Sequence, residues 1–538
     1  MRSERGGSLT ARPVENPWRS RTGRAADGEA DWRYVTLVIL LAAVLRFYRL
    51  GADSLWIDEV FTWRMVNPGP GHGFWEQFRD NIQGPLYMAV LWPFVRDNLS
   101  EFLMRLPAAV AGVAAVPLIM RLGQELGDRR CGEWAALLLA ISPFHIWYSQ
   151  EARGYAFLVL WSLAATLVLT RMLRDGATVR RGVAFGLLSG LAVLSNMSAL
   201  FLILAQALAV LFFARPWRRE HRRGWLTAFG LVGLVALPWL LQATGYWYVG
   251  RLAPGGGGGL QPAGAMSLSV WAYPFTFYAM FYGFTLGPTL TELHRPDRLA
   301  LVKASLPLLA TAGLLAGALF LYGLSRLRAR SRLTLFVWLV VPVLVLTALR
   351  LADIKTFTPR YLATLLPLLL CAAALGVARL PGRAAALAGT AWLALTLWST
   401  ANYHLSDRYA RDDIRAAAAW VAAHGEPGEP VLVPVVTDVF TLYYEGAAVV
   451  KDFWQSGPVD DLATARRLVA ERVGDAPMAW LVLSRSAALD PSHYLPVALA
   501  ELGYVATDRT FPGVRLLRVV RDGNAPRRAP PAAEVDAP

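Results

Sequence analysis

The stretch LVILLAAVLRFYRLGADSLWIDEV, residues 37–60, joins the two kinds of sequence that decide the fold of this chain. Its first part is apolar and nearly uncharged, and its end carries Asp58 and Glu59 beside aromatic residues. The apolar range 33–49 has about the length of the ~20-residue helix that crosses a bilayer. We therefore predict a membrane-spanning helix that is followed at once by an acidic segment.

The apolar pattern recurs along most of the 538-residue chain. Charged residues make up 17%, against roughly 25% in soluble proteins, and hydrophobic residues make up 55%. This composition excludes a disordered chain and argues against a soluble globular enzyme. Eleven ranges are candidate membrane-spanning helices: 33–49, 102–121, 132–149, 154–172, 182–196, 198–214, 225–241, 302–323, 332–349, 361–378 and 384–401.

Two apolar segments need a separate interpretation. The block 182–214 is either one broken helix or two short spans, with the break at Ser195-Asn196-Met197-Ser198. The segment Pro85–Val95 is too short to cross a bilayer and has prolines near both ends. We predict that it is a helix lying in the membrane interface.

The net charge of +14 raises the question of nucleic-acid binding. Most of the basic residues are arginines that gather in alternate short loops between the candidate spans, which is typical of cytoplasmic loops. We therefore expect no nucleic-acid partner. We predict a multi-pass protein of the cytoplasmic membrane, with a disordered cytoplasmic tail over 1–31 and the C-terminal region outside the cytoplasm.

The C-terminal region differs from the apolar region 32–403. Between 404 and 522, short β-rich runs alternate with helical patterns. We expect strands over 431–436, 479–484 and 514–520, and helices over 414–423, 462–473 and 496–502. The sequence thus predicts a small extracytoplasmic α/β domain over 404–522, followed by a disordered Pro/Ala-rich tail over 523–538.

The candidate functional residues gather at the predicted outer ends of the spans. Asp58 and Glu59 lie in an aromatic setting, where a carboxylate with a raised pKa can act as a base. Glu151 and Arg153 lie between two apolar helices on the same side. The alternative interpretations are a solvated loop acid for the first pair and an ion pair or interfacial cap for the second.

Lys355 and Arg360 are basic residues on the predicted outer side, against the general charge bias. A bound phosphate would explain them, because the guanidinium fork of arginine matches phosphate oxygens. Contact with ordinary lipid headgroups is the alternative. The two cysteines and seven histidines lack metal-ligand spacing, so we predict no metal site.

Several of these motifs resemble one family of membrane enzymes. They are Trp56-Ile57-Asp58-Glu59, Gly84-Pro85-Leu86-Tyr87, Arg105-Leu106-Pro107, Ser142-Pro143, Ser149-Gln150-Glu151-Ala152-Arg153 and Arg360-Tyr361-Leu362. Their order and predicted side resemble polyprenol-dependent membrane glycosyltransferases of the C superfamily, in particular family 39 and its bacterial relatives. The chain thus resembles protein O-mannosyltransferases and lipid A aminoarabinose transferases. The resemblance covers about residues 30–400 and implies the GT-C fold.

The resemblance implies an inverting transfer of a sugar from a polyprenyl-phosphate donor to a cell-envelope acceptor, a lipid, glycan or protein. It implies that Asp58 is the base, and that Glu59 and Glu151 orient the acceptor or complete the acidic site. Lys355 and Arg360 would neutralise the leaving phosphate, with help from Arg153. The implied substrate-binding set also contains Gln83, Tyr87, Gln150 and Tyr361. Gln83 stands where many relatives have histidine, and it cannot carry a proton.

Two other functions stay open at this point. A transporter or flippase for lipid-linked sugars would be expected to carry ionisable residues near mid-membrane, which are scarce here. An inactive scaffold with a partner-binding outer domain is the second alternative, and the presence of Asp58 argues against it. Some members of the superfamily use a divalent cation and others do not. We expect no cofactor and leave a divalent cation open.

Overall fold

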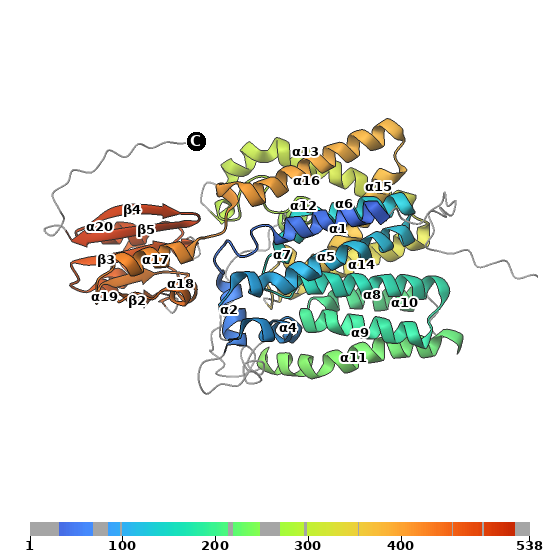
Figure 1. The fold of residues 1–538 in the computed structure, drawn as a ribbon, viewed down its shortest axis with the longest axis horizontal. Helices are drawn as coiled ribbons and strands as arrows, with labels where there is room; N and C mark the ends of the chain where they lie inside the picture. Colours follow the sequence, from blue (N-terminus) through green and yellow to red (C-terminus); the bar gives the residue numbers. More distant parts are fainter. Residues whose placement is uncertain are drawn as a thin grey trace, which may run out of the picture.

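The structure is a computed structural model that describes residues 32–67, 84–96, 99–213, 219–247, 270–294, 298–352, 354–453, 456–486 and 489–521. It has a large helical region and a small α/β domain at one end of the helices (Figure 1). Most of the long helices lie side by side along one direction, as expected for a bundle that crosses a membrane (Figure 1).

The helical region contains both long and short helices. They are α1 (Trp32–Phe47), α2 (Ile57–Val66), α4 (Pro85–Val95), α5 (Glu101–Leu126), α6 (Arg129–Ala140), α7 (Pro143–Ser149), α8 (Tyr155–Asp175), α9 (Val179–Ser195), α10 (Ala199–Phe213), α11 (Arg219–Trp247), α12 (Ala272–Tyr282), η2 (Glu292–His294), α13 (Arg298–Arg326), α14 (Ala329–Leu351), η3 (Pro359–Leu365), α15 (Leu366–Arg379), α16 (Gly382–Leu405) and η4 (Asp407–Tyr409).

The described part of the chain has seven helices that are long and apolar enough to cross a membrane. They are α5, α8, α11, α13, α14, the η3–α15 segment and α16. Helices also form in the other predicted ranges, but α1, α9 and α10 have only 16, 17 and 15 residues. The prediction of a polytopic helical membrane protein is confirmed, whereas the count of eleven spans stays a prediction.

One predicted span is wrong as a single helix. The range 132–149 is divided into α6 and α7, because Pro143 begins a new helix and Ser142 caps it by accepting a hydrogen bond from the His145 amide. The break exposes carbonyl groups at the end of α6, and the buried guanidinium of Arg46 donates to those of Leu139 and Ala140 at 2.9 and 2.8 Å. The chain therefore turns inside the protein without leaving these groups unpaired.

The block 182–214 forms two helices, α9 and α10, in agreement with the second of the two interpretations. Asn196 ends α9 in an extended conformation, and its side-chain oxygen accepts a hydrogen bond from the Ser198 amide at 3.0 Å. The segment Pro85–Val95 is the helix α4, and its place in the membrane interface stays a prediction.

The centre of the bundle is the η3–α15 segment, whose side chains are almost all buried. Small residues allow α13 to lie directly against α15. A Cβ atom on Gly323 would fall 1.8 Å from the carbonyl oxygen of Ala372, and one on Gly376 would fall 2.1 Å from that of Leu319. Close backbone contact of this kind is how helices pack in a bilayer, where the hydrophobic effect does not drive them together.

The C-terminal domain is a five-stranded sheet with the order β2-β1-β3-β5-β4. Its strands are β1 (Pro430–Val433), β2 (Val449–Asp452), β3 (Met478–Leu483), β4 (Tyr504–Phe511) and β5 (Val514–Arg521). Strands β2, β1 and β3 are parallel, and β5 is antiparallel to both β3 and β4. Its helices are α17 (Ile414–His424), α18 (Thr437–Tyr443), α19 (Leu462–Val473) and α20 (Tyr494–Glu501).

Alternate residues of the central strands belong to two separate cores. Trp480 and Val482 of β3 pack with residues of α17 and α18, whereas Ala479 and Leu481 pack with residues of α19 and α20. Helices thus cover both faces of the sheet, which explains why the central strands read as continuous apolar runs. The predicted α/β domain is confirmed in its three expected strands. The prediction missed β2 and β4, which are edge strands with exposed residues.

The α/β domain docks against the segment that precedes α2. The hydroxyl of Tyr443 on α18 accepts a hydrogen bond from the Leu55 amide at 2.8 Å and donates one to Glu101 at 3.1 Å. Arg415 of α17 donates to Glu101 and to the Ala52 carbonyl, both at 2.6 Å. The domain therefore covers the end of the bundle where α2 lies (Figure 1).

Candidate active site

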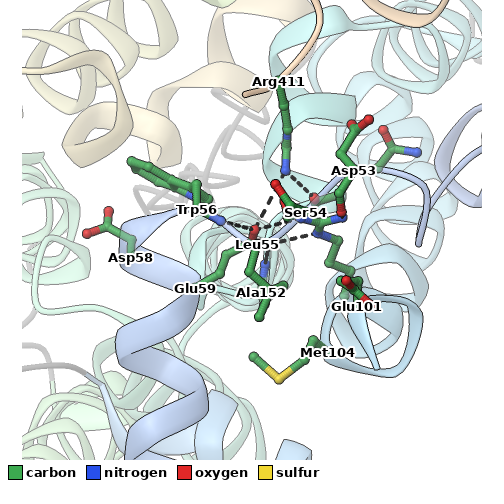
Figure 2. Close-up of polar contacts among 12 residues, drawn as sticks. Asp53, Ser54, Leu55, Trp56, Asp58, Glu59, Glu101, Met104, Ala152 and Arg411 are labelled. Carbon is green, nitrogen blue, oxygen red and sulfur yellow. Dashed lines mark hydrogen bonds and ion pairs between the residues drawn. The ribbon is translucent and has the colours of Figure 1, made fainter. Parts of the chain in front are cut away.

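The site is built on the first turn of α2, where Asp58 and Glu59 are adjacent. Successive helical residues point about 100° apart, so the two carboxylates face different surroundings. Figure 2 shows them leaving α2 in different directions. Their position at the amino end of a helix favours negative charge.

Glu59 is fully buried and bound by donors from several segments of the chain. Arg105 of α5 forms two parallel hydrogen bonds with it, at 2.8 and 2.7 Å. The amides of Ala152 and Trp56 also donate to its oxygens, at 2.7 and 3.2 Å. Burial alone would raise the pKa of Glu59, but the charge and hydrogen bonds of Arg105 outweigh it and hold the pKa below its usual range.

Arg105 has further contacts that make this ion pair the anchor of the loop before α2. It donates to the carbonyl oxygens of Leu50, Asp53 and Ser54 at 3.2, 2.9 and 2.9 Å. One buried guanidinium thus shapes the segment from the end of α1 to Asp58. These contacts indicate that Glu59 orders the site from within the protein.

Asp58 is partly exposed and faces a different cation. Its Oδ2 accepts a hydrogen bond from Arg360 of η3 at 2.9 Å, and its side chain is 20% exposed. The guanidinium of Arg153 donates to the Asp58 carbonyl at 3.2 Å. Burial raises the pKa of Asp58, but the charges of Arg153 and Arg360 outweigh it and keep the pKa low. Asp58 is therefore ionised at neutral pH.

Glu151 lies in the short connection between α7 and α8 and is 1% exposed. Among the residues that the structure describes, its Oε1 atom has no hydrogen-bond partner. Burial, reinforced by the negative charges of Asp58 and Glu59, raises the pKa of Glu151 to about 7, although Arg411 and Arg360 lower it. A carboxyl group with such a pKa can gain or lose a proton near neutrality, as acid–base chemistry requires.

A group of cations and aromatic rings lies beside Asp58. The Arg360 guanidinium is 5.4 Å from the Tyr361 ring centroid and 5.9 Å from that of Tyr155, and Lys355 Nζ is 4.5 Å from the Tyr361 ring. Within the described chain, Nε of Arg360 is buried and has no hydrogen-bond partner. An unused donor next to a second cation suits an anionic ligand such as a phosphate.

Two predicted substrate-binding residues have their polar groups engaged inside the protein. Gln150 donates to the carbonyl oxygens of Arg46 and Tyr48 at 3.0 and 2.8 Å, and accepts from Tyr403 at 2.8 Å. The hydroxyl of Tyr87 on α4 donates to the Met104 carbonyl at 2.6 Å. These bonds tie helices together, and direct substrate contact by either residue stays a prediction. Gln83 lies outside the described residues.

The structure thus brings Asp58, Glu59, Glu151, Arg153 and Arg360 together at one end of the bundle, with Lys355 and Tyr361 next to Arg360. Two important residues were missed as site residues. Arg105 belonged to a recognised motif, and a single arginine within an apolar helix was a usable signal. Arg411 lies in the segment leading to the α/β domain, and no local pattern marks it.

The described residues contain no group of three or more His, Cys, Asp or Glu side chains that could hold a metal ion. The three carboxylates of the site face arginines. Glu59 is not available to coordinate a metal ion, because protein donors already bind both of its oxygens. These residues do not fit a metal centre, and no step below depends on one.

Comparison with known proteins gives a partial family match. The model of the dolichyl-phosphate-mannose-protein mannosyltransferase family matches residues 84–241, a range that runs from α4 into α11. A comparison with curated proteins gives no match.

Solved structures match over most of the chain. The oligosaccharyltransferase AglB from Archaeoglobus fulgidus, in complex with an inhibitory peptide and a dolichol-phosphate, is 15% identical. The match has a TM-score of 0.51 and covers 92% of this chain and 75% of that one. The apo structure of ArnT from Cupriavidus metallidurans is also 15% identical, with a TM-score of 0.51, and covers 93% and 100%. The same archaeal enzyme also matches in a complex with Zn and sulfate, at a TM-score of 0.50 and 15% identity.

These comparisons confirm the GT-C fold and the resemblance to glycosyltransferases of this superfamily. At this level of identity the structural likeness establishes the fold. The matches described here give no support to the transporter alternative.

Proposed function

We propose that the chain is an inverting membrane glycosyltransferase that moves a sugar from a polyprenyl-phosphate donor to a hydroxyl group of a cell-envelope acceptor. The observation that carries this proposal is the contact between Asp58 and Arg360. It places a carboxylate that can serve as a base next to cations that can hold a phosphate. The partial family match and the dolichol-phosphate in the matching archaeal enzyme support a lipid-linked donor.

The reaction needs one displacement at the anomeric carbon. The acceptor oxygen attacks this carbon from the side opposite the phosphate, and Asp58 takes the hydroxyl proton as the new C–O bond forms. The bond between the anomeric carbon and the phosphate oxygen breaks, and the polyprenyl phosphate leaves with the bonding electrons. Arg360 and Lys355 stabilise the negative charge that develops on the phosphate. A single displacement inverts the anomeric configuration.

Arg360 has two partners in this proposal, the Asp58 carboxylate and the donor phosphate. The charge of Arg153 and the charge and hydrogen bond of Arg360 hold the pKa of Asp58 low, which makes Asp58 a weak base. A donor phosphate competes for the same guanidinium, whose Nε atom is unused within the described chain. Asp58 becomes a stronger base once the phosphate draws this charge away, so base activation follows donor binding.

Glu59, Arg105 and Gln150 are positioning residues in this proposal, because their polar atoms bind segments of the protein. Glu151 lies deeper than Asp58 and orients the acceptor or relays its proton. The proposal needs no metal ion. Addition of a chelator tests this point, and a loss of transfer restored by Zn²⁺ or Mg²⁺ would contradict it.

We place the protein in the cytoplasmic membrane with the active site and the α/β domain outside the cytoplasm. Arginine-rich loops at the opposite end of the helices support this orientation, since basic loops stay in the cytoplasm. A reporter fused after residue 405 is expected to be exposed outside the membrane. Cytoplasmic exposure of the reporter would reverse the orientation.

The direct test uses purified full-length protein with radiolabelled polyprenyl-phosphate sugars and cell-envelope fractions as acceptors. Transfer of label by wild-type protein and its loss in Asp58→Asn is the expected result, with a decrease of about 10²–10⁴-fold. Asp438→Asn is a matched control, because Asp438 also pairs with an arginine, Arg64, but on the surface. Equal transfer by wild type and Asp58→Asn with every donor would overturn the proposal. Movement of unreacted donor across the membrane would favour a transporter.

A further inference from the structure

Arg411 belongs to the segment that connects α16 to α17, yet its side chain reaches into the acidic site. It is 8% exposed and extends toward the loop before α2 (Figure 2). Its guanidinium donates to the carbonyl oxygens of Gln150 and Trp147 at 3.1 and 3.5 Å. It also lies 3.9 Å from Glu59 Oε2 and 5.1 Å from the Trp147 ring centroid.

The residues that follow Arg411 are held by the α/β domain. The Asp412 carboxylate accepts hydrogen bonds from Ser484 and Arg485 at 3.0 and 2.7 Å. The Asp413 amide donates to the Pro512 carbonyl at 2.8 Å, and the Asp413 side chain caps α17. Arg411 and Asp412 are thus neighbours in the chain that are bound to different parts of the molecule.

The loop before α2, which leads to Asp58, also contacts this segment and the α/β domain. Ser54 donates to the Asp412 carbonyl at 2.7 Å, and the Arg485 guanidinium lies 5.3 Å from the Trp56 ring centroid. Both contacts depend on the docked position of the α/β domain. If the domain moved away, Arg411 would lose the anchor that keeps its charge next to Glu59 and to the backbone leading to Glu151.

We propose that Arg411 is a positioning residue of the active site, and that docking of the α/β domain completes the site by inserting this cation beside the carboxylates. This inference rests on the proposed function and adds to it a role for the C-terminal domain. Arg411 keeps Glu151 partly ionised at neutral pH by supplying a buried positive charge. It also fixes the backbone before Glu151 through the Gln150 and Trp147 carbonyl groups.

The charges around Glu151 explain why Arg411 has a large effect on the ionisation of this carboxyl group. Asp58 and Glu59 face it from α2 and disfavour its ionisation, as does burial. Arg411 and Arg360 favour ionisation, and Arg411 is the stronger of the two. Arg153 and the hydroxyl groups of Tyr87 and Tyr148 also interact with it electrostatically. Loss of Arg411 leaves a buried carboxyl near two negative charges, and its pKa must rise.

The test measures the protonation of Glu151 in two ways on full-length protein. The first is the pH dependence of reaction with dicyclohexylcarbodiimide, which modifies protonated buried carboxyl groups and is located by mass spectrometry. The second is the acid limb of the pH profile of sugar transfer. The variants are Arg411→Gln, which removes the charge, and Arg411→Lys, which retains it. Arg408→Gln is the matched control, because Arg408 lies on the same segment and pairs on the surface with Glu292.

We expect Arg411→Gln to raise the midpoint pH of carbodiimide labelling of Glu151 and the midpoint pH of the acid limb of sugar transfer, each by about one pH unit or more. Arg411→Lys should stay close to wild type, and Arg408→Gln should match wild type. Midpoints in Arg411→Gln that equal those of wild type would overturn the proposal. If Arg411→Gln does not fold, Asp412→Asn decides, because it weakens the anchor without removing the cation. A shift in the same direction supports the proposal, and an unchanged midpoint overturns it.

The two readouts separate this inference from the proposed function. If wild-type protein transfers no sugar, the proposed function fails, and carbodiimide labelling still reports whether Arg411 controls Glu151. If transfer occurs and labelling of Glu151 is the same with and without the Arg411 charge, the proposed function stands and this inference fails.

Discussion

Glu59 and Glu151 are two buried carboxylates of one site with opposite surroundings. Glu59 has two hydrogen bonds from Arg105 and one each from the Ala152 and Trp56 amides. Glu151 has an Oε1 atom with no partner in the described part of the chain. The pKa of Glu59 is lowered by Arg105 despite burial, whereas burial raises that of Glu151 to about 7. Burial alone therefore does not indicate function, because hydrogen bonds decide whether a buried acid holds structure or remains available for chemistry.

The largest effect on stability is expected from removing Glu59, the carboxylate with a hydrogen-bond donor at each oxygen. Glu59→Ala leaves Arg105 as a buried charge without its counter-charge, which costs about 3–5 kcal/mol. The free energy of unfolding of the purified protein in detergent measures it. Glu133→Ala is the matched control, since its pair with Arg129 is partly exposed and contributes up to about 1 kcal/mol. Equal losses in the two variants would show that the Glu59 contacts carry no special stability.

Replacement of Glu151, the carboxylate with an Oε1 atom that has no hydrogen-bond partner in the described part of the chain, should lower activity without a loss of stability. Glu151→Gln keeps the shape of the side chain and removes its ability to ionise. We expect sugar transfer to fall about 10–100-fold, or roughly 1.4–2.7 kcal/mol in transition-state stabilisation. The free energy of unfolding at pH 7 should not fall, because burial disfavours ionisation of this carboxyl and the neutral amide does not carry that cost. A stability loss as large as that of Glu59→Ala would contradict the comparison.

The pH dependence sharpens the contrast between the acids. Because the pKa of Glu151 is about 7 and that of Asp58 is lowered, Glu151 is the group that loses its charge first on acidification. Transfer should be about half-maximal near pH 7 and fall about tenfold per pH unit below it. This fall in transfer between pH 7 and lower pH, the acid limb of the profile, should be absent from the residual activity of Glu151→Gln. A limb that persists unchanged in this variant would assign it to another group.

Stability should follow pH with opposite signs for the two acids. The folded state raises the pKa of Glu151. Its contribution to the free energy of unfolding is therefore fully present below its pKa in the unfolded chain and is lost as pH rises through about 7. The folded state lowers the pKa of Glu59, so its contribution is present above the unfolded value and is lost on strong acidification. Unfolding measured between pH 5 and 8 should show a decline that is smaller in Glu151→Gln than in wild type.

The smallest effect is expected at the surface of the docking interface. Arg64→Ala removes a pair with Asp438 in which both side chains are well exposed, so the loss should be at most about 1 kcal/mol. The pH profile of transfer should not move. A shift of its acid limb would show that the whole interface, and not Arg411 in particular, controls Glu151.

Much of the helical region was predictable, because long apolar runs leave a membrane helix little alternative. The predicted range 102–121 lies within α5, and the range 154–172 lies within α8 except for Gly154, which immediately precedes that helix. The range 132–149 failed because its hydropathy is continuous while Pro143 interrupts its hydrogen bonding. In the α/β domain the apolar central strands were found, and the polar edge strand β4 was missed because solvent-exposed residues give no apolar signal.

By itself the sequence determined the membrane class, the fold and the group of acids and bases at one end of the spans. Apolar length, charge bias and motif order are properties of the chain read in one dimension. Only the tertiary structure decided what each ionisable group does, since charge interactions depend on distance and burial across segments far apart in sequence. Arg105 is 46 residues from Glu59, and Arg411 reaches Gln150 across 261 residues. No local pattern in the sequence could show that both oxygens of Glu59 accept hydrogen bonds whereas the Oε1 atom of Glu151 has no partner in the described part of the chain.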